Sequence, residues 1–385
     1  MGIMLNGIVR TIREGVNLKI NRYVFSKNYR FANGVCKKNG FDINGITREE
    51  KKEIDAFWSQ YGIKFPDYSW FKMFYAVTGI KKPSFIPHPI AHVLIKKYNL
   101  QAAVAGWDDK NVYELLLPNV KFPKALCHFI RGNFYDSKWN SYNDSPDSLK
   151  DLAESIFNGL GENKSLIIKK TTRTAFGKGV QKVTIKDVSE IIELLNSLKG
   201  QSDFMLQKCI KQHAFLSQFN ESSVNVFRVI TFRCNSEIHF LSASLRFGIE
   251  GHFTDVAFVD GEEIVNVVGV DAKTGEIKEN LYDVNGRKDF TRLSEIKERK
   301  VPYFDEMVKM AVDGHSRLFH FDFVGWDFTI DSEGQVVCVE FNIVSPGTQL
   351  YQFAHGPLLG NYVADYLEPL KDNSVRKRIP REFRL

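Results

Sequence analysis

The segment that most constrains the fold of this chain spans residues 320–347 and reads HFDFVGWDFTIDSEGQVVCVEFNIVSPG. Runs of aromatic and β-branched residues on either side of the turn sequence DSEG predict two antiparallel strands. If Ile330 faces Gln335 across that turn, then Asp327 faces Cys338 in the ladder. The segment therefore predicts a hairpin with polar residues at positions where a buried sheet usually has apolar ones.

Side chains alternate between the two faces of a strand, so Glu340 and Asn342 share a face with Cys338 and hence with Asp327. Two carboxylates and an amide oxygen on one face cost free energy unless a cation or a positively charged ligand compensates them. Hard oxygen ligands of this kind suit magnesium bound together with the phosphates of a nucleotide. The alternative is an amphipathic hairpin with one solvated face.

The composition is that of an ordinary globular protein. The chain has 385 residues, 43% hydrophobic and 25% charged, enough to bury a sizeable core in two or three subdomains. It contains no run of about 18 apolar residues that would span a membrane, and its N-terminus lacks the apolar block of a signal peptide. We therefore expect a cytoplasmic protein. The 5 cysteines are scattered without a CxxC pair, which argues against a disulfide framework or a zinc site.

The net charge of +6 is divided unevenly along the chain. Residues 1–40 carry eight Lys or Arg and one Glu, residues 371–385 carry six Lys or Arg and two acidic residues, and the segment between them has a net charge of −5. This division argues against a globally basic nucleic-acid-binding domain. Basic ends on an acidic body favour contact with phosphates or with anionic lipid. The alternative is that both ends are solvated tails.

The N-terminal segment also has the spacing of an amphipathic helix. Ile8, Ile12, Val16 and Ile20 recur every four residues, and basic residues occupy other positions around the helix. Such a helix can lie on a bilayer surface, which would make the protein peripheral to the inner face of the membrane. In the alternative, its apolar face packs on the core of the protein itself.

The predicted helices and strands alternate without the strict β-α-β rhythm of a doubly wound sheet, which predicts an α+β protein. Thr47 and Glu50 form a capping box at the start of one helix, and we interpret His88 and His92 as packing residues rather than metal ligands. Helices are expected at 47–61, 66–80, 89–98, 111–117, 147–158, 186–199, 302–319 and 357–368. Strands are expected at 124–130, 165–170, 180–185, 203–210, 225–234 and 237–248, with two more short strands near turns at Gly261 and Gly275.

A strand, a glycine-containing loop and a second strand follow one another in LIIKKTTRTAFGKGV, residues 166–180. Lys169 and Lys170 end the first strand, and Gly177 and Gly179 let backbone N–H groups approach an anion closely. The spacing differs from that of a Walker A motif. The loop is interpreted either as a phosphate-binding element or as a tight hairpin with solvated lysines.

Two arginines lie inside apolar strands, Arg228 in NVFRVITF and Arg246 in SASLRFG. An arginine in a strand interior costs free energy unless it is paired or faces a site. Both can face phosphates, or both can pair with an acid such as Asp255 or Asp322. A serine-hydrolase elbow and a Rossmann glycine fingerprint are absent from the sequence, so neither activity has support.

Taken in order, these motifs resemble those of the ATP-grasp superfamily, and most of all its sugar-transfer-associated branch, over residues ~105 to 370. The resemblance rests on DDKNVYELLLP at 108–118, the lysine and glycine segment at 166–180, MLQKCIKQH at 205–213, SSVNVFRVITFR at 222–233, SLRFG at 244–248 and the paired segments WDFTI and VEFNIVSPG.

The resemblance implies an α+β ATP-grasp fold, in which two α+β subdomains clamp ATP, preceded by a mainly helical N-terminal region. We expect the chain to divide into a basic N-terminal segment at 1–40, a helical region at 41–105, the ATP-grasp N-terminal and lid subdomains at 106–210, the C-terminal subdomain with the metal site at 211–370, and a basic tail at 371–385.

The resemblance also implies which residues hold the nucleotide. Lys110 and Lys169 would contact the phosphates of ATP, and Gly177 and Gly179 would form the lid over them. The hinge that meets adenine through its main chain and side chains would consist of Leu206, Gln207 and Lys208.

The resemblance assigns the remaining site residues to the metal and to the transferred group. Asp327, Glu340 and Asn342 would hold Mg²⁺, with Mn²⁺ as an alternative. Arg228 and Arg246 would act as catalytic residues that stabilise the transferred phosphoryl group and the oxyanion of the intermediate.

The function implied by the resemblance is an ATP-dependent carboxylate–amine ligase that works through an acylphosphate, in surface polysaccharide or glycoconjugate biosynthesis. Its partners would be a small-molecule or glycan carboxylate and an amine, with peripheral contact to an anionic membrane or a lipid-linked substrate and none to nucleic acid. The alternatives are a phosphotransferase acting on a hydroxyl group and a nucleotide-binding module without turnover.

Overall fold

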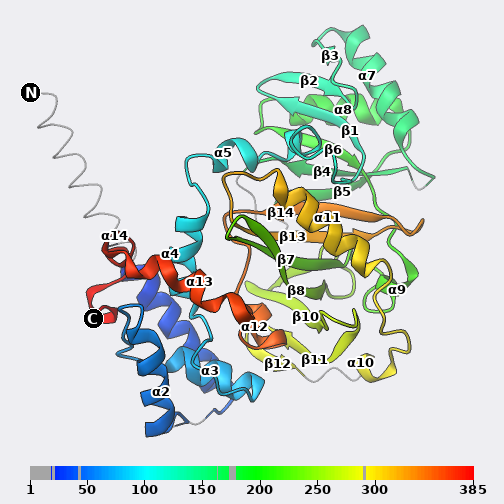
Figure 1. Ribbon diagram of the computed structural model, residues 1–385. Coiled ribbons are helices and arrows are strands. Elements are labelled where there is room, and N and C mark those ends of the chain that lie inside the picture. The colour runs from blue at the N-terminus through cyan, green and yellow to red at the C-terminus, as the bar shows by residue number, and fades with distance from the viewer. Residues whose placement is uncertain (1–18, 20–21, 42–44, 163, 173–178, 289–291) are drawn as a thin grey trace, which may run out of the picture.

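The structure is a computed structural model that describes residue 19 and residues 22–41, 45–162, 164–172, 179–288 and 292–385 (Figure 1). Within these residues the strands form a six-stranded and an eight-stranded sheet, and every pair of neighbouring strands is antiparallel. The expected α+β class is confirmed. In the part of the chain that is described, no helix is both long and apolar enough to cross a membrane.

The smaller sheet has the strand order β3-β2-β1-β6-β4-β5 and lies within residues 106–210, the part of the chain predicted to hold the N-terminal and lid subdomains; it is called the lid sheet below. Two amphipathic helices, α7 and α8, bury Leu152, Ile156 and Leu195 in the core beside this sheet. Its elements are β1 (Ala125–Ile130), β2 (Asn133–Asp136), β3 (Ser141–Tyr142), α7 (Pro146–Gly159), β4 (Ser165–Lys170), β5 (Val180–Thr184), α8 (Val188–Leu198) and β6 (Phe204–Lys208).

The larger sheet has the order β12-β11-β10-β8-β7-β13-β14, with β9 paired to β10. We expected two short strands after residue 248, whereas the structure has four, β9 to β12, because the turns at Gly261 and Gly275 each join two strands and β12 then pairs with β11. The strands are β7 (Val226–Cys234), β8 (Glu237–Phe247), β9 (Val256–Val259), β10 (Glu262–Val270), β11 (Ile277–Asp283), β12 (Gly286–Lys288), β13 (Phe323–Ile330) and β14 (Val336–Asn342).

The two faces of the larger sheet are covered differently. Phe227 and Val229 of β7 share a core with helix α11 (Phe304–Ser316), while Ile230 and Phe232 share a second core with helix α12 (Gln349–His355) and the N-terminal helices. Residues of β7 alternate between these cores, as the pleat requires. Arg228 therefore faces the α12 side of the sheet.

A mainly helical region precedes the sheets, as expected. Residues 22–38 are helical, and α2 (Arg48–Ser59) begins with the predicted capping box, since Thr47 and Glu50 exchange hydrogen bonds. His88 lies inside this region with its ring 6.4 Å from that of Trp70. The remaining helices of the region and of the connection to the lid are α3 (Ser69–Thr78), α4 (His88–Tyr98), α5 (Val104–Trp107), η1 (Lys110–Val112) and α6 (Tyr113–Leu116).

The C-terminal end returns to the helical region (Figure 1). Val375, Ile379 and Phe383 are buried in its core, and the Lys64 backbone N–H donates to the Phe383 carbonyl at 3.0 Å. The alternative that residues 371–385 form a solvated tail is therefore wrong, because part of this basic segment packs on the helical region. The single helix predicted at 357–368 is replaced by three shorter pieces, η2 (Gly360–Tyr362), α13 (Val363–Leu367) and η3 (Glu368–Lys371). Four short helices that were not predicted are α9 (Ala214–Ser217), α10 (Arg292–Glu295), α14 (Asn373–Arg376) and η4 (Arg381–Phe383).

The apolar repeat of Ile8, Ile12, Val16 and Ile20 lies outside the described residues, and so does Gly177 in the predicted lid. The following residues, 22–38, bury Phe25, Tyr29 and Val35 in the core of the helical region.

Candidate active site

The register of the β13–β14 hairpin differs from the predicted one near the turn. Ile330 pairs with Val336 instead of Gln335, and Cys338 pairs with Phe328 instead of Asp327. An extra residue in β14 then shifts the ladder, so Asp327 pairs directly with Glu340. A bulge of this kind inserts one residue opposite a single partner and re-aims nearby side chains. The predicted convergence of Asp327 and Glu340 is therefore reached through a bulge, in place of the predicted regular ladder.

Asp327 is the centre of a buried ionic network. The Arg228 guanidinium donates to both of its carboxylate oxygens, at 2.6 Å from Nε and 2.8 Å from Nη2, and Asn342 donates from Nδ2 at 3.1 Å. Burial alone would raise the pKa of Asp327, but Arg228, Arg246 and these hydrogen bonds outweigh burial and hold that pKa below its usual range. Asp327 is therefore charged at neutral pH.

Arg246 extends the network across the sheet. It forms an ion pair with Asp255, its Nη1 lies 3.7 Å from Asp327, and it donates to the Tyr351 hydroxyl at 3.4 Å. Sequence reasoning named Asp255 only as a structural partner of an arginine, and the structure brings it into the site. Asp322, the other acid considered, pairs with Arg233 at 3.6 Å.

The two arginines differ in how many of their donors are used. Arg228 also donates from Nη1 to the Pro346 carbonyl at 2.7 Å, so each of its nitrogens has an acceptor. The Nε of Arg246 is buried and has no hydrogen-bond partner among the described residues. Arg246 therefore has a buried N–H, at Nε, that is available to a ligand.

Two lysines from other elements lie near the Glu340 carboxylate. Lys110 of η1 is buried, and its Nζ lies 3.6 Å from the Glu340 carboxylate. Burial lowers the pKa of Lys169, at the end of β4, to about 8, a shift that Glu340 opposes and Lys110 increases. The lysines predicted to contact phosphates and the Glu340 predicted to hold metal thus share one electrostatic environment.

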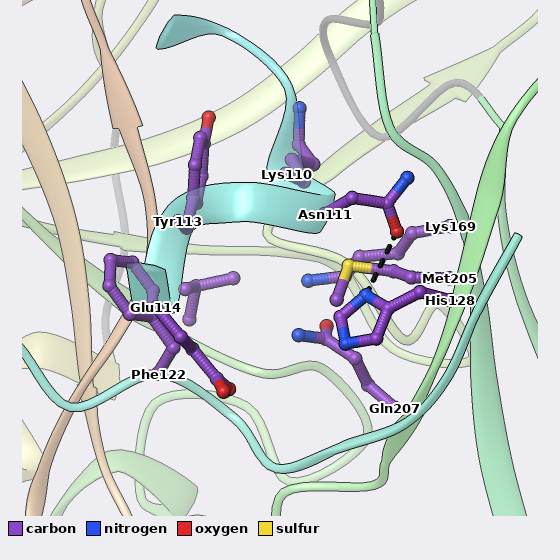
Figure 2. A pocket seen from close by; sticks show the side chains of 10 residues that line it. Lys110, Asn111, Tyr113, Glu114, Phe122, His128, Lys169, Met205 and Gln207 are labelled. Carbon is purple, nitrogen blue, oxygen red and sulfur yellow. Dashed lines mark hydrogen bonds between the residues drawn. The ribbon is translucent and has the colours of Figure 1, made fainter. Parts of the chain in front are cut away.

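A cavity opens beside these lysines, between the lid sheet and β14 (Figure 2). Of the three predicted hinge residues, only Gln207 lines it. Leu206 is buried in the lid core and Lys208 is exposed.

Gly179 has a φ of 80°, which only glycine adopts without strain, and its carbonyl accepts from Lys170 N–H at 3.0 Å.

Sequence reasoning missed several residues of this cavity. Asn111 and His128 line it from η1 and β1, and Val339 lines it from the bulge. His128 had a usable signal, because it is a polar residue inside the apolar strand ALCHFI. Asn111 and Val339 had none, since only the fold and the bulge bring them to the cavity.

The donor set of the hairpin suits a hard divalent cation. Asp327, Glu340 and Asn342 offer carboxylate and amide oxygens on adjoining strands, and the Glu340 side chain is 31% exposed. Among the described residues, Asp327 Oδ1 accepts one hydrogen bond, from Arg228 Nε, so it keeps a lone pair for a cation. These residues fit Mg²⁺, and Glu340 is more accessible than the buried Asp327.

The model of the family described as sugar-transfer associated ATP-grasp matches residues 90–365 of this chain. The chain belongs to that family. The ATP-grasp match spans the lid sheet, the larger sheet and every predicted site residue, and it leaves out residues 22–89, which hold three of the N-terminal helices. The search of curated proteins found no match to the chain.

Solved ATP-grasp structures resemble this ATP-grasp protein only distantly. D-alanyl-alanine synthetase A from Vibrio cholerae is 13% identical with a TM-score of 0.41, and covers 71% of this chain and 66% of its own. The ATP-grasp ligase PsnB bound to a minimal precursor is 13% identical with a TM-score of 0.40 (71% and 64%), and the VanG D-Ala:D-Ser ligase from Enterococcus faecalis is 14% identical with a TM-score of 0.40 (70% and 63%). The matched part spans just under two thirds of these chains.

Proposed function

We propose that this protein is an ATP-dependent carboxylate–amine ligase that forms an acylphosphate intermediate and acts in surface polysaccharide or glycoconjugate biosynthesis. The observation that carries the proposal is the 3.6 Å approach of Lys110 Nζ to Glu340 beside Lys169. This arrangement joins cations suited to phosphates with an oxygen ligand suited to magnesium. Phosphoryl transfer needs little more than positioning and charge neutralisation, and this cluster supplies both.

The residues divide the work in the proposed reaction. Lys110 and Lys169 hold the phosphates of ATP while the substrate carboxylate attacks the terminal phosphorus and ADP leaves. The amine then attacks the acyl carbon, a C–N bond forms, and phosphate leaves as the C–O bond breaks. Arg246 donates to the oxyanion of that second step through its unpartnered Nε. Arg228 holds Asp327 in place and is a positioning residue.

Mg²⁺ would be held by Glu340, Asn342 and Asp327, with Mn²⁺ as an alternative, and when bound it neutralises charge on the phosphates. The carboxylate of Glu340 is partly exposed, whereas Asp327 is buried, so Glu340 is the anionic ligand that a metal ion can reach more easily. The side chains of the protein do the rest: the two lysines hold the phosphates, Arg246 donates to the oxyanion, and Arg228 keeps Asp327 ionised.

A screen of carboxylates and amines for ADP release, followed by mass spectrometry of the products, tests the proposal. A ligase gives ADP, phosphate and an amide, and hydroxylamine in place of the amine gives a hydroxamate. A phosphotransferase gives ADP and a phosphate ester. Failure of Mg–ADP to bind in calorimetry, or a phosphate ester as the only product, would contradict the proposed ligase.

A further inference from the structure

Three of the five most exposed large apolar side chains among the described residues lie near the connection from the helical region to the lid sheet. Phe319 is 71% exposed, Leu115 is 58% exposed and Leu100 is 50% exposed. A single exposed apolar residue is common on a protein surface, whereas a contiguous group of them marks an interaction site. Whether these residues are contiguous follows from the contacts around them.

Contacts around His320 bring two of these residues and a tryptophan together. The Leu100 N–H donates to the His320 carbonyl at 2.9 Å, which places Leu100 beside the loop that holds Phe319. The ring of Trp107 lies 6.2 Å from that of His320 and 5.9 Å from that of Phe321, and Trp107 is itself partly exposed. The end of α4, the short helix α5 and the loop after α11 thus share one surface.

A further contact joins Leu115 to the same loop. Arg317, two positions before Phe319, donates from Nε to the Leu116 carbonyl at 3.4 Å. Leu115 directly precedes Leu116 in α6, so the exposed residues of α6 and of the loop are neighbours. We call this group the apolar patch, and it consists of Leu100, Trp107, Leu115 and Phe319.

Basic side chains flank the apolar patch. Lys96 and Lys97 occupy the last turn of α4 and are exposed, and the exposed Arg317 lies beside Phe319. Burial and the nearby charge of Arg378 lower the pKa of Lys96, so two cations approach each other here. Apolar residues bordered by lysine and arginine suit an anionic lipid surface, which accepts both kinds of side chain.

Three acidic residues near the patch have other roles. Glu114 lines the cavity between the lid sheet and β14. Asp109 accepts from the Asn111 N–H and caps η1. Asp372 lies near Lys97 and caps α14 through its acceptance from Ser374. Two of these carboxylates are thus used in capping and the third lines the cavity, so they do not make the patch an acidic surface.

The C-terminal segment connects the apolar patch to the basic helix at residues 22–38. α14 packs against α4, and the two lie with α5 on the same side of the sheets (Figure 1). Further along the segment, Glu382 pairs with Arg22 at 3.6 Å, and the Phe383 ring lies 5.4 Å from that of Phe25. The basic face of the first described helix and the basic flank of the patch therefore adjoin one segment of the chain.

The size of the apolar patch decides between a protein and a membrane as its partner. A stable protein interface buries about 800 Å² on each partner and takes about 20–30 residues a side, far more than four side chains supply. Insertion of a few side chains into the head-group region of a bilayer needs no such area, because each apolar group gains on leaving water. A small patch with a basic flank therefore favours an anionic membrane over a second copy of the chain.

We propose that the apolar patch inserts into the head-group region of an anionic bilayer while Lys96, Lys97 and Arg317 contact the lipid phosphates. The proposal goes beyond the proposed ligase, because it concerns where the protein works and not which bond it forms. The segment that holds Leu115 also carries Lys110 into the active site. Insertion therefore keeps the active site close to the bilayer surface.

Co-sedimentation of the full chain with vesicles of phosphatidylcholine and phosphatidylserine in equal parts, at low and at high salt, tests the proposal. The triple variant Leu100→Ser/Leu115→Ser/Phe319→Ser is expected to bind at least about tenfold more weakly than the parent at high salt, where charges are screened. Phe258→Ser/Val259→Ser is the matched control, because these exposed residues lie on β9 and outside the patch. The control should bind as the parent does.

Trp107 reports insertion separately from adsorption. Trp58, Trp70 and Trp326 are fully buried, and Trp139 lies in a loop of the lid sheet. Phospholipids brominated on their acyl chains should quench the tryptophan fluorescence of the parent, and Trp107→Phe should remove most of that quenching. Quenching that persists unchanged in Trp107→Phe would show that another surface meets the membrane and would overturn the proposal.

The remaining outcomes also decide the matter. Equal binding by the parent and the triple variant overturns insertion, and so does complete release of the parent by salt, which indicates adsorption by charge alone. Dimerisation of the parent that the triple variant lacks, without vesicle binding, shows that a second copy covers the patch. If the triple variant has a lower thermal unfolding temperature than the parent, Phe319→Ser alone replaces it and should still weaken binding. None of these results alters nucleotide binding or the reaction product, so they leave the proposed ligase to its own test.

Discussion

At the scale of the residue, the decisive pair is Arg228 and Asp327. Their side chains are 6% and 5% exposed, and they meet through two hydrogen bonds in a sheet interior. Two such charges are costly to bury and are tolerated because each satisfies the other. Removing one partner leaves an uncompensated charge, so the pair controls stability as well as the charge state of the predicted metal site.

Arg228→Met is therefore expected to destabilise the protein by about 3–5 kcal/mol, measured by urea unfolding. The folded-state pKa of Asp327 is depressed, so its stabilisation is present above the ordinary aspartate pKa and is lost as pH falls. The difference between parent and variant should shrink from pH about 6 to about 3. Lys309→Met, which breaks an exposed pair with Asp313, is the control and should change little. A pH-independent difference would contradict the argument.

Lys169 predicts a pH dependence of nucleotide binding. Its pKa is lowered to about 8, so it is charged below that pH and increasingly neutral above it. Affinity for Mg–ADP should fall up to about tenfold between pH 7.5 and 9.5, because phosphates favour the charged form. Lys169→Arg stays charged throughout and should flatten the profile. Calorimetry at each pH decides the matter, and equal slopes for both proteins would show that another group is responsible.

At the scale of the element, the β13–β14 hairpin builds the site by means of an irregularity. The bulge between the pairs Asp327–Glu340 and Phe328–Cys338 lets Val339 line the cavity while Glu340 remains opposite Asp327. A hairpin with regular pairing cannot place adjacent residues toward one side, because successive side chains alternate. One element thus places an apolar wall of the cavity beside the carboxylate that is proposed to bind magnesium.

Glu340→Gln should keep the fold but remove most magnesium-dependent nucleotide turnover, because one hard anionic ligand becomes neutral. Turnover is measured over a range of magnesium concentrations, with circular dichroism as the check on folding. Glu333→Gln, at the exposed turn of the same hairpin, serves as the matched control. Unchanged turnover in Glu340→Gln at limiting magnesium would remove Glu340 from the metal site.

At the scale of the whole molecule, the first described helix, residues 22–38, meets the C-terminal end of the chain. The helix at residues 22–38 packs Phe25 and Tyr29 against Phe383, with ring centroids 5.4 Å and 4.9 Å apart. Basic side chains on the remaining face of that helix are exposed, namely Arg22, Lys27, Arg30, Lys37 and Lys38. Packing on the core thus leaves the charge of the N-terminal helix facing solvent, where a phosphate or a lipid head group can reach it.

We expect the protein to co-sediment with phosphatidylserine vesicles at low ionic strength and to be released as salt rises, since screening shortens the range of exposed charges. Changing Lys27, Arg30 and Lys37 together to Glu should reduce this binding at least about tenfold. A Lys309→Glu variant, on the exposed face of α11, should bind as the parent does. Failure of the parent to sediment with vesicles would make the basic helix purely structural.

The α+β class, the capping box at Thr47 and the family could all be predicted from the amino-acid sequence, because they depend on local periodicity and on motifs in a fixed order. It also indicated Asp327, Glu340 and Lys169, since charged residues in or beside apolar strands stand out. Tertiary structure alone decided the bulge, the pairing of Arg246 with Asp255 and the arrival of Asn111 at the cavity. These features depend on contacts between residues far apart in the chain. Such contacts are favoured because burying a polar group without a partner costs free energy, and that cost arises only when tertiary packing of the two sheets removes the group from water.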